Sequence, residues 1–294
     1  MAQQRSSPGT GDAAQALEAL TEEIGELRPL GATARQVMRI TSEDRFSAHE
    51  LANVIAADQA LTAKMLRLSN SAYYGFARRI TTMRDAVVLL GFREVRATTM
   101  ASCIIEAMPV SRHINYETFW HYSVSIGMLA EVLARAERLK TDEAFTAGVV
   151  HNIGRLALDQ HRPAAFGEVL AYASSRRVSL HEAERAVLGF TDAELGHSLA
   201  QYWGFPPELT DAVAYHYLEP SAHKDPRSLA SFVSRARAFA RAHGSSDGVE
   251  PAQEPSSPPA EWLQAPIASS LKTAGGVDGV MQRAGAFMEF AGVR

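Results

Sequence analysis

Apolar residues recur along most of this chain at spacings of three and four, which is the period of an amphipathic helix. Leu17, Leu20, Ile24 and Leu27 form one such stripe near the N-terminus. Sustained alternation of apolar and polar residues, the pattern of a half-buried strand, is absent. The pattern therefore predicts an all-α fold.

Local start and stop signals support the same prediction. A Ser or Thr followed three residues later by an acid caps a helix, because the hydroxyl accepts a backbone N–H and the acid reaches back to the cap. Prolines fall at the breaks between periodic segments. Asn70 is expected to bond the backbone of a neighbouring loop. The capping pairs are Ser47–Glu50, Thr82–Asp85, Ser179–Glu182 and Thr191–Glu194, and the prolines are Pro29, Pro109, Pro163, Pro206, Pro207 and Pro220.

These breaks divide the chain into a first helical lobe that ends near Met108 and a second that runs from about Asn115 to Gly244. Residues 245–261 are rich in Pro, Ser and Glu, which predicts a flexible linker. Residues 262–294 carry enough apolar side chains for one or two helices that dock on the rest.

Composition narrows the class of protein. The 294 residues are 46% hydrophobic and 21% charged, with a formal net charge of −4, so no general positive field attracts nucleic acid or anionic membranes. The single cysteine, Cys103, excludes an internal disulfide framework and is typical of a reducing compartment. Residues 1–12 lack the apolar core of a signal peptide, and no run of eighteen apolar residues occurs. We therefore expect a cytoplasmic protein without a membrane span.

Histidines at widely separated positions are candidates for one shared site. His121 follows Phe119–Trp120, His151 ends an apolar run, and His216 lies in another. A lone histidine on an apolar helical face is more often a hydrogen-bonded core residue than a metal ligand. Three on separate helices favour a shared site, but only modestly without a short ligand motif.

Several segments together resemble the HDOD domain, the HD-related output domain, over about residues 27–222. The resemblance implies a two-lobed helical fold, with an N-terminal lobe over 27–109 and a degenerate HD-like lobe over 115–222 whose helix continues to about 244. The segments are Leu27–Thr33, Leu51–Gly75, Ile80–Gly91, Phe119–Ser123, Ala147–Arg155 and Trp203–Pro206.

The resemblance also implies a relation to the HD phosphohydrolases, in which histidines and aspartates bind divalent metals that activate water. His121, His151 and His216 are retained at the corresponding positions. The remaining ligand positions differ: Asn152 stands for the signature aspartate, Asp192 for a histidine, Tyr217 for a second histidine, and Arg237 for a late aspartate.

These replacements weaken a metal site. An amide at Asn152 removes both a ligand and a neutralising charge. A guanidinium at Arg237 would repel a cation and could instead hold an anion or pair with Asp192. The histidines could still bind Zn²⁺ or Ni²⁺ adventitiously. We expect no bound metal, no cofactor and no catalytic residue.

A second candidate site is basic. Between Lys64 and Arg96 seven cations face only two acids, Asp85 and Glu94, and Tyr73, Tyr74 and Phe76 lie among them. Phosphate contact with base stacking is chemically available there, although a solvated helix face with packed tyrosines is the favoured interpretation. The cations are Lys64, Arg67, Arg78, Arg79, Arg84, Arg93 and Arg96.

The sequence thus predicts a non-catalytic regulatory protein of signal transduction, which binds a signalling partner protein or a small anionic ligand through a domain with an incomplete metal site. One alternative is a metal-dependent phosphohydrolase of the cyclic dinucleotide phosphodiesterase type. The other, less favoured, is a nucleic-acid-binding regulator that uses the basic segment. Residues 263–294 could dock or release through the linker as a two-state element. The signal sensed and the oligomeric state stay open.

Overall fold

The computed structural model describes residues 10–27, 30–42, 48–71, 74, 76, 78–108, 112–250 and 254–293, and every regular element within these ranges is a helix. The all-α prediction is confirmed. Thr82 caps its helix by accepting the backbone N–H of Asp85, and Ser179 and Thr191 each begin a complete capping box. The fourth predicted cap, Ser47, lies outside the described residues.

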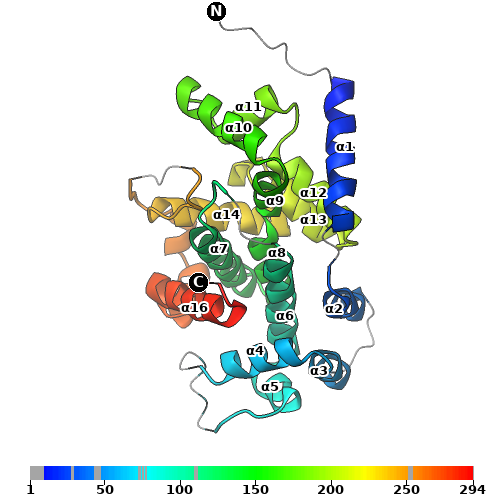
Figure 1. The fold of residues 1–294 in the computed structure, drawn as a ribbon. Helices are drawn as coiled ribbons and strands as arrows, with labels where there is room; N and C mark the ends of the chain where they lie inside the picture. The colour runs from blue at the N-terminus through cyan, green and yellow to red at the C-terminus, as the bar shows by residue number, and fades with distance from the viewer. Residues whose placement is uncertain are drawn as a thin grey trace, which may run out of the picture.

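The first lobe is built from short helices that cross one another (Figure 1). In it α3 packs on α5, α2 on α6, and α4 on α5. Asn70 ends α4 and holds the following loop, because its side chain donates to the Ile80 carbonyl at 2.7 Å and accepts the Ile80 N–H at 2.8 Å. The helices are α2 (Ala32–Ser42), α3 (Ala48–Ala56), α4 (Gln59–Ser69), α5 (Met83–Leu90) and α6 (Phe92–Ala107).

The second lobe is centred on α7 and α8, which lie side by side in the middle of the molecule (Figure 1). Their backbones touch, since a Cβ added at Gly148 would lie 2.4 Å from the Cα of Gly127. The lobe consists of α7 (Tyr116–Ala136), α8 (Thr141–Val150), α9 (Ile153–His161), α10 (Pro163–Arg176), α11 (Leu180–Val187), α12 (Asp192–Tyr202), α13 (Pro207–Tyr215), the 3₁₀ turn η1 (Pro220–Ala222) and α14 (Leu229–Ala242).

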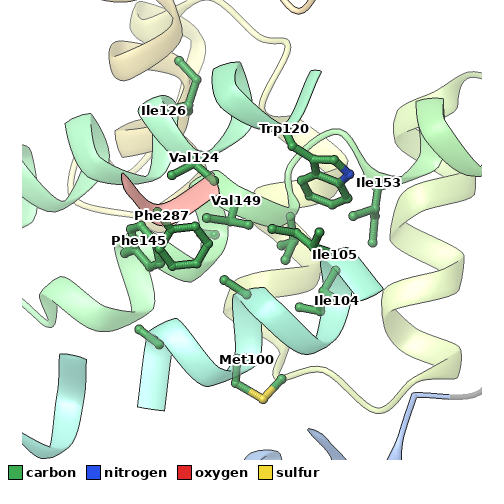
Figure 2. Close-up of a cluster of buried hydrophobic side chains, with 14 of the residues drawn as sticks. Met100, Ile104, Ile105, Trp120, Val124, Ile126, Phe145, Val149, Ile153 and Phe287 are labelled. Atoms are coloured by element: carbon green, nitrogen blue, oxygen red, sulfur yellow. The ribbon is translucent and has the colours of Figure 1, made fainter. Parts of the chain in front are cut away.

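One hydrophobic core runs through both lobes. Figure 2 shows Ile104 and Ile105 of α6 beneath Val124 of α7 and Val149 of α8, with Phe145 and Phe287 at one side. Helix α1 (Thr10–Leu27) joins this core from outside by packing Leu20 and Ile24 toward α12. The relative position of the lobes is therefore set by burial of apolar surface.

The C-terminal segment also packs against both lobes. It forms the 3₁₀ turn η2 (Ala260–Leu263), α15 (Ile267–Thr273) and α16 (Gly276–Ala291). Trp262 is buried and stacks on Phe239 of α14, with ring centroids 4.0 Å apart. Helix α16 contacts α7 of the second lobe and α4 of the first. Among the described helices, none combines the length and apolar composition that a bilayer span requires.

Candidate functional site

Four of the predicted site residues meet where helices end. His151 follows α8, Asn152 precedes α9, Asp192 begins α12, and His216 follows α13. All four are buried, and the rings of His151 and His216 lie 5.0 Å apart between centroids. The fold thus assembles a polar cluster in the second lobe from distant parts of the chain.

Two glycines bring the helices that carry this cluster together. A Cβ on Gly154 of α9 would lie 1.9 Å from the carbonyl oxygen of Asp192 and 2.5 Å from the backbone nitrogen of Gly196 on α12. Only hydrogen atoms fit in that space, so α9 and α12 are in backbone contact. This contact places the Asp192 carboxylate beside the first turn of α9.

Both buried histidines are fixed in one tautomer. Nδ1 of His151 lies 2.6 Å from the Gly148 carbonyl, and Nδ1 of His216 lies 2.8 Å from the Val213 carbonyl. A carbonyl only accepts, so we assign the proton to Nδ1 in each ring and a lone pair to Nε2. Neither Nε2 atom has a hydrogen-bond partner among the described residues.

These imidazoles are neutral. Burial lowers the pKa of His151 to about 3, and the guanidinium of Arg237 adds to the effect. Burial and the same guanidinium hold the pKa of His216 well below its usual value. The pair therefore presents lone pairs rather than positive charges at neutral pH.

Arg155, which was not among the predicted site residues, provides a buried cation in this cluster. Its side chain is fully buried, its Nε atom donates to Oδ2 of Asp192 at 2.5 Å, and its Nη1 atom donates to Asp247. Nη2 lies 3.6 Å from Oε1 of Glu250. Burial alone would lower the pKa of Arg155, but the surrounding carboxylates raise it well above its usual value. The guanidinium is a permanent internal counter-ion.

The prediction that Arg237 could pair with Asp192 is wrong, because Arg155 takes that position. Arg237 is buried and its Nη1 donates to the carbonyl oxygen of His216 at 2.9 Å. Its charge also acts on the phenol of Tyr122 on α7, whose ring lies 6.1 Å from that of His151. The α7 side chain seen beside His151 is thus Tyr122, while the predicted His121 is half-buried one position earlier.

His181 and Glu184 of α11 complete the cluster, and neither was predicted. His181 Nε2 lies 3.1 Å from Oδ1 of Asp192, and Glu184 accepts the Asp192 backbone N–H at 3.0 Å. Burial and the neighbouring Asp192 raise the pKa of Glu184 well above its usual value, whereas Arg155 outweighs burial and holds the pKa of Asp192 well below. Tyr217, exposed at 39%, covers the outer side of His181 with ring centroids 4.4 Å apart.

Asp247 enters the cluster from the segment 245–261, which composition predicts to be a flexible linker. Asp247 is 3% exposed. Its carboxylate accepts hydrogen bonds from the Arg155 guanidinium and, at 3.5 Å, from Nδ2 of Asn152. It also accepts the backbone N–H groups of Val249 and Glu250. Glu250 is held by Arg241 at 2.5 Å. Residues 245–250 therefore pack onto the second lobe, because Asp247 and Glu250 face the buried Arg155 and Glu250 also pairs with the half-buried Arg241.

The residues present do not fit the metal-bridged centre of an HD hydrolase. His151 and His216 offer free Nε2 atoms, and the ligand atoms of His181, Glu184 and Asp192 lie within 4.8 Å of one another. However, Asp192 already binds a guanidinium, and Asn152 contributes an amide that is directed at Asp247. Arg155 and Arg237 both lower the pKa of His151, so their field opposes a second cation at the same place.

Three of the seven cations of the basic segment 64–96 are paired with acids. Lys64 binds Glu106, Arg96 binds the buried Asp142, and Arg78 lies 3.5 Å from Asp85. Tyr74 donates to Glu94 at 2.7 Å and stacks on Phe76, while Tyr73 lies outside the described residues. The exposed cations that remain are Arg67, Arg79, Arg84 and Arg93.

Solved structures share this architecture. An HDOD domain protein of unknown function from Geobacter sulfurreducens is 21% identical, with a TM-score of 0.74, over 95% of this chain and 99% of its own. A candidate phosphohydrolase from Shewanella amazonensis is 26% identical, with a TM-score of 0.67, over 94% and 97%. A candidate signal transduction protein from Marinobacter aquaeolei is 20% identical, with a TM-score of 0.71, over 98% and 67%.

At the level of sequence, an uncharacterized protein of Treponema pallidum is 22% identical over 220 residues, and the match spans 42% of that protein's length. The HDOD domain model matches residues 27–219, close to the range that the sequence motifs predict. With more than half of its length matched, the chain belongs to the HDOD domain family.

Proposed function

We propose that this chain is a non-catalytic regulatory protein of signal transduction, which acts by binding a partner protein or a small anionic ligand. The observation that carries the proposal is the buried contact of Arg155 with Asp192 and Asp247. The negative charges of these two carboxylates are neutralised by a side chain of the protein itself. A metal would have to displace that guanidinium into a buried, low-dielectric space, which is costly.

The second candidate is a metal-dependent phosphohydrolase. The free Nε2 atoms of His151 and His216 favour it, because each ring is oriented by a carbonyl at Nδ1 in the way that metal-binding imidazoles are oriented. The candidate phosphohydrolase of Shewanella amazonensis shares the fold. Asn152, Arg155 and Arg237 argue against it, because an amide replaces a ligand carboxylate and the two guanidinium groups oppose a metal cation.

Metal content and turnover together separate these functions. Protein purified without an affinity tag is assayed for metal, then loaded with Mn²⁺, Fe²⁺ or Zn²⁺ and tested on bis(p-nitrophenyl) phosphate and on a cyclic dinucleotide. We expect substoichiometric metal and no turnover above buffer. Stoichiometric metal with turnover that His151→Ala abolishes would establish the phosphohydrolase instead.

A further inference from the structure

A cavity lies between the two lobes, away from the degenerate metal site. It has a volume of about 700 Å³, within the range of about 300–1,000 Å³ typical of small-molecule sites. Helices α2 and α6 of the first lobe form one side, and α8, the segment 203–209 and the start of α14 form the other. An occupant would touch both lobes at once.

The walls of the cavity are mainly apolar. Met38 and Met100 lie on the first-lobe side, and Trp203, Phe205 and Leu209 on the other. Figure 2 shows Met100 on the side of α6 that faces away from the core residues of α7 and α8. Methionines adapt their shape to an occupant, and aromatic rings offer flat surfaces for an apolar body.

The segment Trp203–Pro206, one of the motifs of the family resemblance, is shaped by its turn. Gly204 ends α12 with a φ of 75°, a left-handed conformation that favours glycine. The N–H of Phe205 returns to the carbonyl of Ala200 at 2.9 Å. This turn redirects the chain so that residues on both sides of Gly204 line the cavity.

Among the charged side chains at the cavity, one cation has no acidic partner in the described part of the chain. Arg96 is neutralised by Asp142, and Lys140 by Glu143 at 2.7 Å. Glu208 lies in the first turn of α13, where the helix dipole offsets part of its charge. Arg35 is exposed on α2, donates to the carbonyl of Leu30, and has no carboxylate partner in the part of the chain that the structure describes.

We propose that this cavity binds an organic anion with an apolar body, whose acidic group is held by Arg35 and whose body packs against Met38, Trp203 and Phe205. The site rests on the proposed function, for which it supplies the small anionic ligand. Because its walls come from both lobes, occupancy would favour one packing of the lobes over others.

A pair of matched probes tests this site. 8-Anilinonaphthalene-1-sulfonate carries an anion on an aromatic body, and N-phenyl-1-naphthylamine has the same body without the charge. Isothermal titration and fluorescence should show saturable binding of the sulfonate with one site per chain. Arg35→Gln should weaken the binding of the sulfonate by about tenfold, because one charged hydrogen bond is lost. The affinity for the neutral probe should not change. Arg79→Gln, an exposed cation outside the cavity, is the control.

Met38→Trp should weaken the binding of both probes at least about tenfold, because the indole would project into the space that their aromatic body occupies. If that variant does not fold, as judged by thermal melting, Leu209→Trp fills the same cavity from the other lobe. Absence of saturable binding, equal weakening of both probes by Arg35→Gln, or unchanged affinity in the filled variant would each overturn the proposal. None of these outcomes involves metal or phosphoester turnover, so they leave the test of the proposed function separate.

Discussion

The Nε atom of Arg155 lies 2.5 Å from Oδ2 of Asp192, and both side chains are buried between α9 and α12. In the HD phosphohydrolases, histidines and aspartates bind a metal ion that can exchange and activate water. The cation that binds Asp192 in this chain is a side chain of the protein itself. A guanidinium cannot act as a Lewis acid, and this one neutralises the Asp192 carboxylate inside the fold.

Removal of Arg155 should strongly destabilise the fold. Arg155→Met keeps much of the volume but leaves Asp192 and Asp247 as unpaired buried carboxylates, which should lower the free energy of unfolding by about 3–5 kcal/mol in urea denaturation. The matched control is Arg162→Met, whose pair with Glu23 is exposed on both sides. That change should cost below about 1 kcal/mol. Equal effects of the two variants would contradict a buried counter-ion.

Acid should destabilise the protein through His151. Its folded pKa of about 3 lies below the ordinary 6.5, so between these values the unfolded chain binds a proton that the folded chain does not. Above pH 6.5, His151 does not change the free energy of unfolding. Between pH 6.5 and about pH 3 it lowers the free energy of unfolding by about 1.4 kcal/mol per pH unit.

His151→Gln isolates this effect, because the amide can still donate to the Gly148 carbonyl but does not titrate. Glu184, whose raised pKa contributes with the opposite sign, is present in both proteins and cancels in the comparison. Denaturation between pH 7 and 5 should show a shallower loss of stability in the variant. Parallel curves would mean that His151 is protonated in the folded protein.

Backbone contact between α9 and α12 should make Gly154 intolerant of a side chain. The Cβ of Gly154→Ala would overlap the Asp192 carbonyl oxygen at 1.9 Å, and overpacking of this kind costs about 1–3 kcal/mol or more. Gly285→Ala in α16 is the control, since no atom lies within 4 Å of its added Cβ. There the gain in helix propensity should stabilise by up to about 1 kcal/mol. In thermal melting, Gly154→Ala should therefore lower the melting temperature and Gly285→Ala should raise it.

The C-terminal helix should contribute to global stability. Phe287 is 4% exposed and its ring lies 5.6 Å from that of Phe145, so Phe287→Ala should cost about 3–5 kcal/mol. Leu263→Ala, at a position 69% exposed, should have almost no effect. A negligible cost at Phe287 would show that α16 leaves the core in solution, as the proposed release of residues 263–294 requires.

Nucleic acid should bind weakly or not at all, because Lys64, Arg78 and Arg96 are already paired with acids. Fluorescence anisotropy with a single-stranded oligonucleotide should give no measurable affinity near physiological salt. Tight binding that falls steeply with salt, and that Arg78→Ala with Arg79→Ala removes, would favour the nucleic-acid-binding alternative.

The helices and much of the site's layout could be predicted from local sequence. Ser179 and Thr191 begin their helices because each cap is complete within four residues, and Asn70 binds the next loop across ten residues. Short segments such as Leu51–Gly75 and Ala147–Arg155, the second of which contains His151, indicated the family that the domain match then showed. Such features depend on neighbours in the chain, so periodicity and spacing reveal them.

Only the tertiary structure decided which charges meet. Arg155 joins Asp192 across 37 residues and Asp247 across 92, and no local pattern distinguishes these residues from surface charges. Asp247 lies in a segment whose composition indicates a linker, yet burial makes its carboxylate a partner of Arg155. Sequence by itself predicted the all-helical class and several helix starts, and the family resemblance implied that a metal-bridging aspartate is absent at Asn152. Packing determined that a guanidinium is the cation of the site, because long-range ion pairs form only where the fold excludes water.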